Sequence, residues 1–320
     1  MEQIQQIINT EMNQLNQVIR RDLESGVPLI NTVGEYIISA GGKRIRPLLT
    51  ILCAKALENS DHLIYKMAAM IEYIHTATLL HDDVVDESGL RRGRPTANAV
   101  FGNAASVLVG DFIYTRAFQM MVESESLRVL KIMADATNVI SEGEVLQLLN
   151  IGRSDLTSQE YFAVIESKTA KLFEAAARVA AIISGADKIQ EDALAFYSIY
   201  LGTAFQIVDD ILDYSSSSEV MGKNVGDDLL EGKVTLPLLY LLHGDNNEYR
   251  QLICQAIEQP KEASIERVIE VVKTSGALEY CANIAKDYVA KAQAELQKIS
   301  QNQYVTILNE LALKSIERIS

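Results

Sequence analysis

The hydrophobic positions of this chain recur at helical spacing almost throughout. In the first helix they fall three and four residues apart, at Ile4, Ile7, Ile8, Met12, Leu15 and Ile19. This spacing places the apolar side chains on one face of an amphipathic helix. The same periodicity predicts helices over residues 3–23, 28–39, 46–58, 62–86, 96–122, 126–150, 158–184, 188–214, 234–243, 247–258, 263–273, 277–297 and 302–317.

No stretch shows the alternation that predicts a strand, and no Pro-, Gly- or Ser-rich linker divides the chain. Residues that make turns are scarce, with 17 Gly and 5 Pro in 320 residues, where average usage would give about 22 and 16. The helices between residues 62 and 214 are apolar on most faces, so other helices must surround them. We therefore predict one all-α domain spanning residues 1–320.

Composition excludes several classes of protein. The net charge is −14, from 29 Lys+Arg against 43 Asp+Glu, which argues against nucleic-acid binding. The three cysteines are far apart and form no CxxC pair, which fits a reducing compartment. The N-terminus lacks the pattern of a signal peptide, and uncharged stretches fall short of a membrane span. We expect a soluble, cytoplasmic protein without stable membrane insertion.

Two aspartate clusters stand at the ends of apolar helices. Residues 82–86 and residues 209–213 both read DDxxD, with aspartates at 82, 83, 86, 209, 210 and 213. The first and last aspartates of each cluster lie about 40° apart on one helical face. Like charges one turn apart repel each other, and the C-terminal end of a helix favours cations. A single cluster could be a solvated acidic rim, but two copies favour a carboxylate site for hard divalent cations completed by phosphates.

Cationic residues follow the same segments. Lys43, Arg44 and Arg46 lie in the Gly-flanked turn GGKRIRP, and Arg91, Arg92 and Arg94 follow the first cluster. Lys168 and Lys171 share a helix, while Lys223 and Lys233 follow the second cluster. Any one of these could be a surface charge, but their clustering favours phosphate binding. His75 projects to within about 20° of Asp82, so it is either a cleft residue or a core histidine.

The motifs GGKRIRP, HDDVVDESGLRRGRPT, SKTAKLF, GTAFQIVDDILD and GKNVGDDLLEGKVTLP occur in that order. They resemble the motif set of the all-trans polyprenyl diphosphate synthases, over about residues 27–240. The stretch ANAVFGNAASVLVGDFIYTRAFQMM is similar to the bacterial octaprenyl members of that family. The resemblance implies an all-α helical bundle of the prenyl-synthase (terpenoid synthase) type with a deep central cavity, usually a homodimer.

The resemblance also implies roles for individual residues. Asp82, Asp86 and Asp209 would hold two to three Mg²⁺ ions, with Asp83, Asp210 and Asp213 in support. Isopentenyl diphosphate would contact Lys43, Arg46, His75 and Arg92. The allylic diphosphate would contact Arg91, Lys168, Thr169, Gln206, Lys223 and Lys233, of which Lys168 and Gln206 also count as catalytic. The small side chains at Ala77 and Thr78, where short-chain members carry aromatics, imply a long product. Met121 is one candidate for the floor of the product tunnel.

The function implied is the repeated addition of isopentenyl diphosphate to an allylic diphosphate, with farnesyl diphosphate as the expected starter. We expect an octaprenyl chain for a quinone, or another long product from heptaprenyl to decaprenyl. A terpene cyclase is disfavoured because the chain has no Trp and only 6% aromatic residues. A di-iron bundle would need a second Glu-x-x-His beside Glu72–His75. A non-catalytic partner subunit is disfavoured because all six aspartates are present.

Overall fold

The computed structural model describes residues 2–215, 226–259 and 264–317. The chain divides into two compact units, each of which is described by itself. Unit 1 comprises Met1–Ala136, Leu172–Phe196 and Glu295–Glu310; unit 2 comprises Thr137–Lys171, Tyr197–Ala294 and Leu311–Ser320. The boundaries between the units fall inside long helices. The expectation of one domain stays a prediction.

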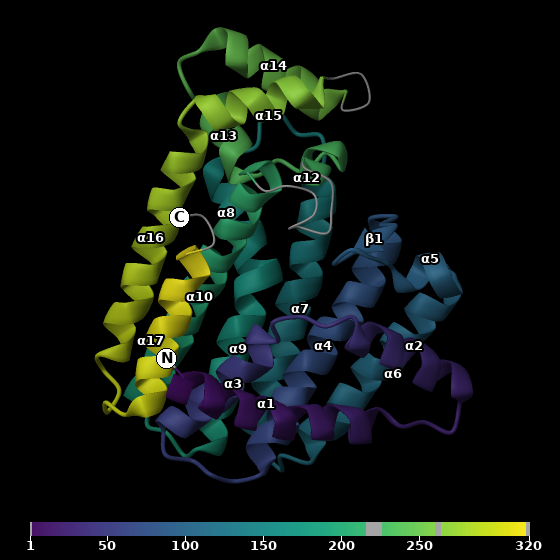
Figure 1. Cartoon of the computed structure of the whole chain (residues 1–320), viewed down its shortest axis with the longest axis vertical. Coiled ribbons are helices and arrows are strands. Elements are labelled where there is room, and N and C mark those ends of the chain that lie inside the picture. Colours follow the sequence, from purple (N-terminus) through teal and green to yellow (C-terminus); the bar gives the residue numbers. More distant parts are fainter. Residues whose placement is uncertain (1, 216–225, 260–263, 318–320) are drawn as a thin grey trace. The chain divides into compact units, whose positions relative to one another are not determined.

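The first half of the chain is helical apart from one small hairpin. Its elements are α1 (Glu2–Leu23), α2 (Pro28–Ser39), α3 (Ile45–Ala56), α4 (Leu63–Val85), β1 (Leu90–Arg91), β2 (Arg94–Pro95), α5 (Ala97–Phe101), α6 (Asn103–Val122) and α7 (Leu127–Asn150). In unit 1, α4 packs against α1, α3 and α6, and α1 runs across the upright α4 and α6 (Figure 1). Of the 23 residues of α4, 13 are buried, as its apolar sequence predicts.

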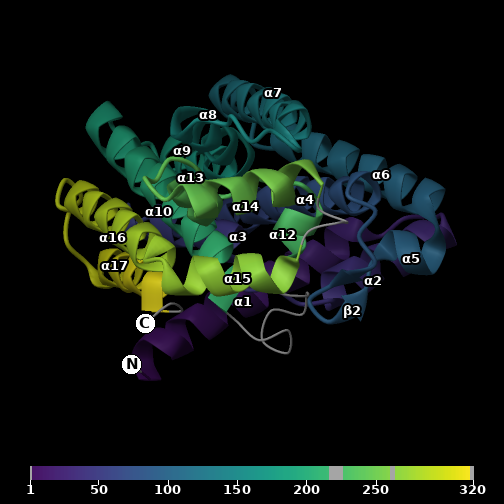
Figure 2. The same cartoon turned by 90° about the horizontal axis from the view of Figure 1, so that it is seen from above.

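The second half continues with helices and one π-helical turn. Its elements are α8 (Ser158–Ile165), η1 (Glu166–Ala170), α9 (Lys171–Ile183), α10 (Lys188–Ser215), α12 (Asp227–Leu230), α13 (Leu236–Leu242), α14 (Asn247–Glu258), α15 (Ile265–Thr274), α16 (Ala277–Leu296) and α17 (Gln303–Ile316). In unit 2, α13, α14 and α15 lie against one another (Figures 1 and 2). Buried side chains from these helices, from α8 and from the C-terminal half of α10 form one apolar cluster.

The sequence predicted most helix bounds within two residues, and the structure corrects four points. A short helix, α12 (Asp227–Leu230), lies where no helix was expected. A two-residue hairpin pairs β1 with β2 where no strand was expected. The helix predicted over 96–122 is interrupted at Gly102, whose φ of 84° suits glycine. The helix predicted over 158–184 contains the π-helical turn η1.

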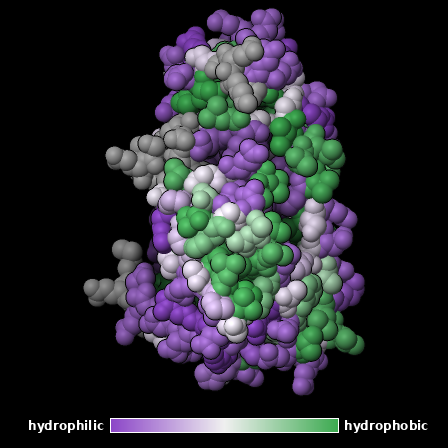
Figure 3. Space-filling model, turned by 90° about the vertical axis from the view of Figure 1, so that its right-hand side faces the viewer, coloured by the Kyte–Doolittle hydropathy of each residue, from purple (hydrophilic) through white to green (hydrophobic). Residues whose placement is uncertain are grey.

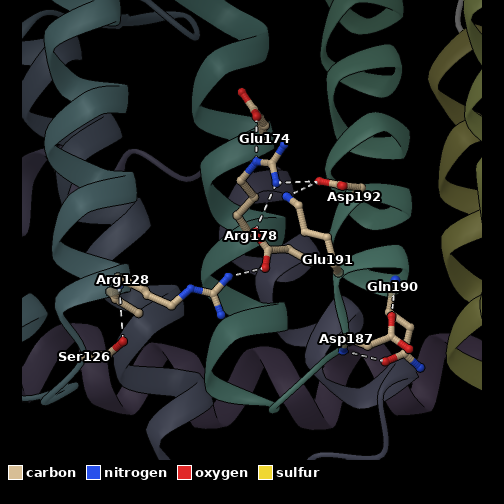
Figure 4. Close-up of polar contacts among 10 residues, drawn as sticks. Ser126, Arg128, Glu174, Arg178, Asp187, Gln190, Glu191 and Asp192 are labelled. Atoms are coloured by element: carbon tan, nitrogen blue, oxygen red, sulfur yellow. Dashed lines mark hydrogen bonds and ion pairs between the residues drawn. The ribbon is translucent and has the colours of Figure 1, made fainter.

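An ion-pair network in unit 1 ties α9 to the start of α10 and to α7 (Figure 4). The Glu191 side chain is 5% exposed and accepts from Arg178 Nη1 at 3.1 Å and from Arg128 Nη2 at 2.5 Å. Arg178 also donates to Glu174 and Asp192. Because the carboxylate of Glu191 is buried between two guanidiniums, its charge is compensated without water.

Candidate active site

The first aspartate cluster ends α4 in unit 1. Asp82 and Asp86 are half-buried, and Asp86 is the C-cap residue of the helix. Asp83 is fully buried, and its Oδ1 accepts from Arg91 Nε at 2.8 Å and from Arg91 Nη2 at 2.7 Å. The middle aspartate therefore fixes the guanidinium of Arg91, while Asp82 and Asp86 are more exposed than Asp83.

The hairpin that follows this cluster sets the position of Arg92. The two turn residues, Arg92 and Gly93, have φ values of 54° and 72°, as a type I′ turn between two-residue strands requires. A left-handed arginine is uncommon and is held by its surroundings. Its guanidinium packs against Gly42, where a Cβ would lie only 2.3 Å from Arg92 Nη1. Gly42 is therefore needed for this close approach as well as for its own φ of 142°.

His75 of α4 contacts a second predicted site residue. Arg46 Nη1 lies 3.2 Å from His75 Nε2, and since arginine can only donate, Nε2 is the acceptor. Burial, and then the charges of Arg46 and Arg92, lower the pKa of His75 well below its usual 6.5, so the ring is neutral at neutral pH. The Arg46 guanidinium also lies 4.7 Å from the ring centre of Phe173.

A pocket in unit 1 brings several of these residues together. Its lining includes Tyr36, Gly41, Glu72, His75, Thr76, Asp83, Arg91 and Arg92. Sequence reasoning considered Glu72 only for iron binding, yet its Oε1 lies 3.7 Å from Arg44 Nε. Arg44 also donates to the carbonyl of Ile38, so this arginine of the GGKRIRP turn points inward. Lys43 is the neighbouring residue in the same turn.

The residues expected to control product length lie in unit 1. Ala77 of α4 is 0% exposed and Met121 of α6 is 1% exposed. Thr78 is half-buried and donates to the carbonyl of His75 at 2.8 Å. The packing of α4 against α6 is compatible with a role in the product tunnel, and that role stays a prediction.

The second aspartate cluster lies in α10, in unit 2. Asp210 is 2% exposed; its Oδ2 accepts from the Tyr161 hydroxyl at 2.6 Å and its Oδ1 from Gln206 Nε2 at 2.9 Å. Burial, followed by the charge of Asp228, raises the pKa of Asp210 to about 7. Asp213 is 3% exposed, whereas Asp209 is half-buried. The middle aspartate again holds a predicted substrate-binding residue, here Gln206.

The π-helical turn carries Lys168 and Thr169. Thr169 Oγ1 donates to Gln206 Oε1 at 2.9 Å, and Lys168 Nζ donates to Glu144 and to Gln147 of α7. The turn fits closely against α7 at Gly143, where a Cβ would lie 2.8 Å from the Cβ of Ser167. Such turns often occur at functional sites, and this one brings Thr169 to Gln206.

The remaining predicted residues follow the second cluster. Lys233 Nζ forms an ion pair with Glu231 at 2.6 Å. Lys223 lies outside the described residues. The first cluster belongs to unit 1 and the second to unit 2, and the shared binding of Mg²⁺ by Asp82, Asp86 and Asp209 stays a prediction.

The clusters supply oxygen ligands of the kind that Mg²⁺ prefers. Over residues 2–215, 226–259 and 264–317, no three His, Cys, Asp or Glu side chains come close enough to hold an ion by themselves. A magnesium ion typically takes one or two carboxylates and completes its coordination with water and substrate phosphates. Asp82 and Asp86 in unit 1, and Asp209 in unit 2, are half-buried carboxylates of the type that such an ion takes. Among the same residues, no helix is long and apolar enough to cross a bilayer.

Comparisons with curated proteins give full-length matches. The chain is 51% identical over 318 residues to an octaprenyl diphosphate synthase of Haemophilus influenzae, covering 99% of this chain and 97% of that protein. It is 51% identical over 319 residues to an octaprenyl diphosphate synthase of Escherichia coli, covering 99% of each. The matches thus extend through the C-terminal residues, where the sequence analysis found no motif.

Solved structures have the same all-α fold. A polyprenyl synthase from Caulobacter crescentus, complexed with calcium and isoprenyl diphosphate, has a TM-score of 0.95 at 42% identity, covering 100% of this chain and 98% of that one. A heptaprenyl diphosphate synthase from Staphylococcus aureus has a TM-score of 0.93 at 29% identity, covering 98% and 99%. The profile of the polyprenyl synthetase family matches residues 27–274. With its two DDxxD helices and full-length relatives, the chain belongs to the polyprenyl synthetase family.

Proposed function

We propose that this chain is a long-chain all-trans polyprenyl diphosphate synthase, with octaprenyl diphosphate as its product and farnesyl diphosphate as its starter. The observation that carries the proposal is the shared arrangement of the two DDxxD clusters. In each, the buried middle aspartate holds a polar side chain, Arg91 or Gln206. Asp82, Asp86 and Asp209 are half-buried and would bind the metal. The octaprenyl diphosphate synthases at 51% identity support the product length.

The reaction forms one carbon–carbon bond in each cycle. The allylic C–O bond breaks, and both electrons leave with the diphosphate. The double bond of isopentenyl diphosphate attacks the resulting allylic cation, and the released diphosphate takes the proton that is then lost. Holding two anionic substrates in line supplies the proximity effect, and no nucleophilic side chain is required.

The side chains of unit 1 are suited to bind anions. Arg91 is oriented by Asp83, Arg92 by its turn, and Arg46 by neutral His75. We assign Lys43, Arg46, His75 and Arg92 to isopentenyl diphosphate and Arg91 to the allylic diphosphate. A neutral imidazole adds no charge but fixes the direction of the guanidinium, which matters for bidentate contacts with phosphate.

The side chains of unit 2 are suited to the allylic substrate and its cation. Thr169 and Gln206 form a hydrogen-bonded pair, and we assign both, with Lys168, Lys223 and Lys233, to the allylic side. Asp82, Asp86 and Asp209 would hold two to three Mg²⁺ ions. Magnesium, when bound, would stabilise negative charge on the departing diphosphate.

A single assay tests this function. The purified chain is incubated with Mg²⁺, farnesyl diphosphate and labelled isopentenyl diphosphate, and the dephosphorylated products are separated by chromatography. We expect octaprenol, and no elongation in a matched reaction that contains excess chelator. A dominant heptaprenyl or decaprenyl product would correct the chain length. A folded protein without any elongation would contradict the proposal and favour a non-catalytic partner subunit.

We also propose a homodimer. Large hydrophobic side chains gather on the face that carries α5 and α6 (Figure 3). On α6, Leu108 is 68% exposed and Val122 is 62% exposed, with Phe118 at 39%. Exposed apolar patches of this kind mark interaction surfaces. Analytical ultracentrifugation should give twice the chain mass, and a charged substitution at Leu108 should produce monomers.

The reaction is assigned to the cytoplasm, as part of the same proposal. Cys53, Cys254 and Cys281 are all free thiols, and Cys53 and Cys281 are buried. Free cysteines are typical of reducing compartments.

A further inference from the structure

Tyr161 is a buried residue of unit 2 that the sequence analysis did not single out. It is 4% exposed and belongs to the apolar cluster of that unit. The start of α8 fixes its place: Thr157 and Glu160 form a reciprocal capping box, and Glu160 also binds Arg153 at 2.9 Å. These contacts fix the start of α8, and Tyr161 of this helix places its hydroxyl next to Asp210.

The hydroxyl of Tyr161 acts as a permanent donor. Burial, and then the charge of Asp210, raise the pKa of Tyr161 well above its usual value of 10. A protonated phenol donates to Asp210 Oδ2 at 2.6 Å, a short distance typical of a hydrogen bond to a carboxylate. This hydrogen bond therefore occupies Asp210 Oδ2 and restrains the rotation of the Asp210 carboxyl group.

The second carboxylate oxygen determines how Gln206 is oriented. Gln206 Nε2 donates to Asp210 Oδ1 at 2.9 Å, so the amide nitrogen of Gln206 faces Asp210. The amide oxygen of Gln206 then faces Thr169, and Oε1 accepts a hydrogen bond from Thr169 Oγ1 at 2.9 Å. Three hydrogen bonds thus connect Tyr161 of α8 to Thr169 of the π-helical turn, with α10 between them.

We propose that Tyr161 is a positioning residue that acts through Asp210 to hold Gln206 and Thr169 in the orientation that binds the allylic diphosphate. The inference rests on the proposed function, since that function assigns Gln206 and Thr169 to the allylic substrate. Without the phenol, Asp210 Oδ2 would lose the donor described here, and the carboxylate could turn toward Gln206 with either oxygen. The amide of Gln206, and with it Thr169, would then lose its fixed direction.

The test replaces Tyr161 by Phe, which keeps the ring and removes the hydroxyl. A hydrogen bond to a charged group corresponds to roughly ten- to hundredfold in an equilibrium constant. We expect the KM for farnesyl diphosphate to rise about tenfold and kcat to fall, while the KM for isopentenyl diphosphate stays within about twofold.

Tyr65 provides a matched control in unit 1. Its hydroxyl donates to Glu11 Oε2 at 2.5 Å, and the residue is also 4% exposed. Tyr65→Phe removes the same type of buried phenol–carboxylate bond away from the aspartate clusters. It should lower the melting temperature without changing either KM. A Tyr161→Phe enzyme that behaves like Tyr65→Phe would overturn the proposal and make Tyr161 a purely structural residue.

A second variant covers the case in which Tyr161→Phe does not fold. Incorporating 4-aminophenylalanine at position 161 keeps a donor, but a weaker one than a phenol. Its KM for farnesyl diphosphate should lie severalfold above that of the parent, and an unchanged value would also overturn the proposal. The parent enzyme is assayed first: absence of elongation there contradicts the proposed function, whereas an active parent with unaffected variants contradicts only this inference.

Discussion

Replacing Glu72 by Gln should change how the stability of the protein depends on pH. Glu72 lies in the arginine-rich pocket of unit 1, with 13% of its side chain exposed. Its Oε1 faces Arg44, and its buried Oε2 has no hydrogen-bond partner within the described residues. Burial raises the pKa of Glu72 from 4.5 to about 7, although the charges of Arg44, Arg46 and Arg92 oppose the shift.

The direction of this pH dependence depends on whether the folded or the unfolded protein binds the proton of Glu72 more tightly. Between pH 4.5 and about 7, the folded protein keeps the Glu72 proton and the unfolded chain does not. Unfolding therefore releases a proton, and the free energy of unfolding falls by about 1.4 kcal/mol per pH unit. This stabilisation is complete below pH 4.5 and is lost as the pH rises through 7, a total of about 3 kcal/mol. A glutamine cannot titrate, so Glu72→Gln lacks this slope.

The assay is urea unfolding followed by circular dichroism at pH 5, 6, 7 and 8. We expect the stability of the parent minus that of Glu72→Gln to fall by about 2.5 kcal/mol over this range. Glu35→Gln, at a half-exposed carboxylate of α2, measures the effect of the substitution itself. A parent–variant difference that stays constant within about 1 kcal/mol would refute the reasoning. The result matters for function because a protonated Glu72 leaves the positive charge of the arginines available to diphosphate.

Three further predictions concern Ala77, Gly42 and Glu191. Ala77→Tyr fills a site that is 0% exposed, so the main product should become shorter, and an unchanged chromatogram of dephosphorylated products would contradict this role. Gly42→Ala places a Cβ 2.3 Å from Arg92 Nη1, so the KM for isopentenyl diphosphate should rise at least about tenfold in steady-state assays, with the KM for the starter unchanged. Glu191→Gln weakens the network of Arg128 and Arg178, so urea unfolding should show a loss of about 2 kcal/mol with both KM values unchanged.

The helices could be predicted because their apolar spacing is regular and their ends carry ordinary signals. The hairpin could not, since strands of two residues have no period and its Arg92–Gly93 turn replaces the usual Asn–Gly. The π-helical turn was missed for a related reason. Its single extra residue leaves the apolar pattern helical, so the turn is visible only in the backbone of residues 166–170.

Sequence reasoning located the aspartate clusters but could not assign their members. Helical projection separates Asp83 from Asp82 by about 100°, yet it does not say that Arg91 meets Asp83 or that Tyr161 meets Asp210. Those partners come from other elements and depend on tertiary packing. Glu72 and Arg44 illustrate the same limit: both were visible in motifs, but their contact joins α4 to a turn 28 residues away.

The structure also gives a physical reason for the DDxxD spacing. Residues i and i+4 share one helical face, so both can serve a bound ion, while residue i+1 turns into the protein and can hold a neighbouring side chain. Asp83 and Asp210 are the i+1 residues, and both are buried. The clusters nevertheless differ at the last position, where Asp86 is half-buried and Asp213 is 3% exposed. The first cluster is therefore suited to supply two carboxylates to metal and the second only one, which is the unequal division that the proposed set of Asp82, Asp86 and Asp209 requires.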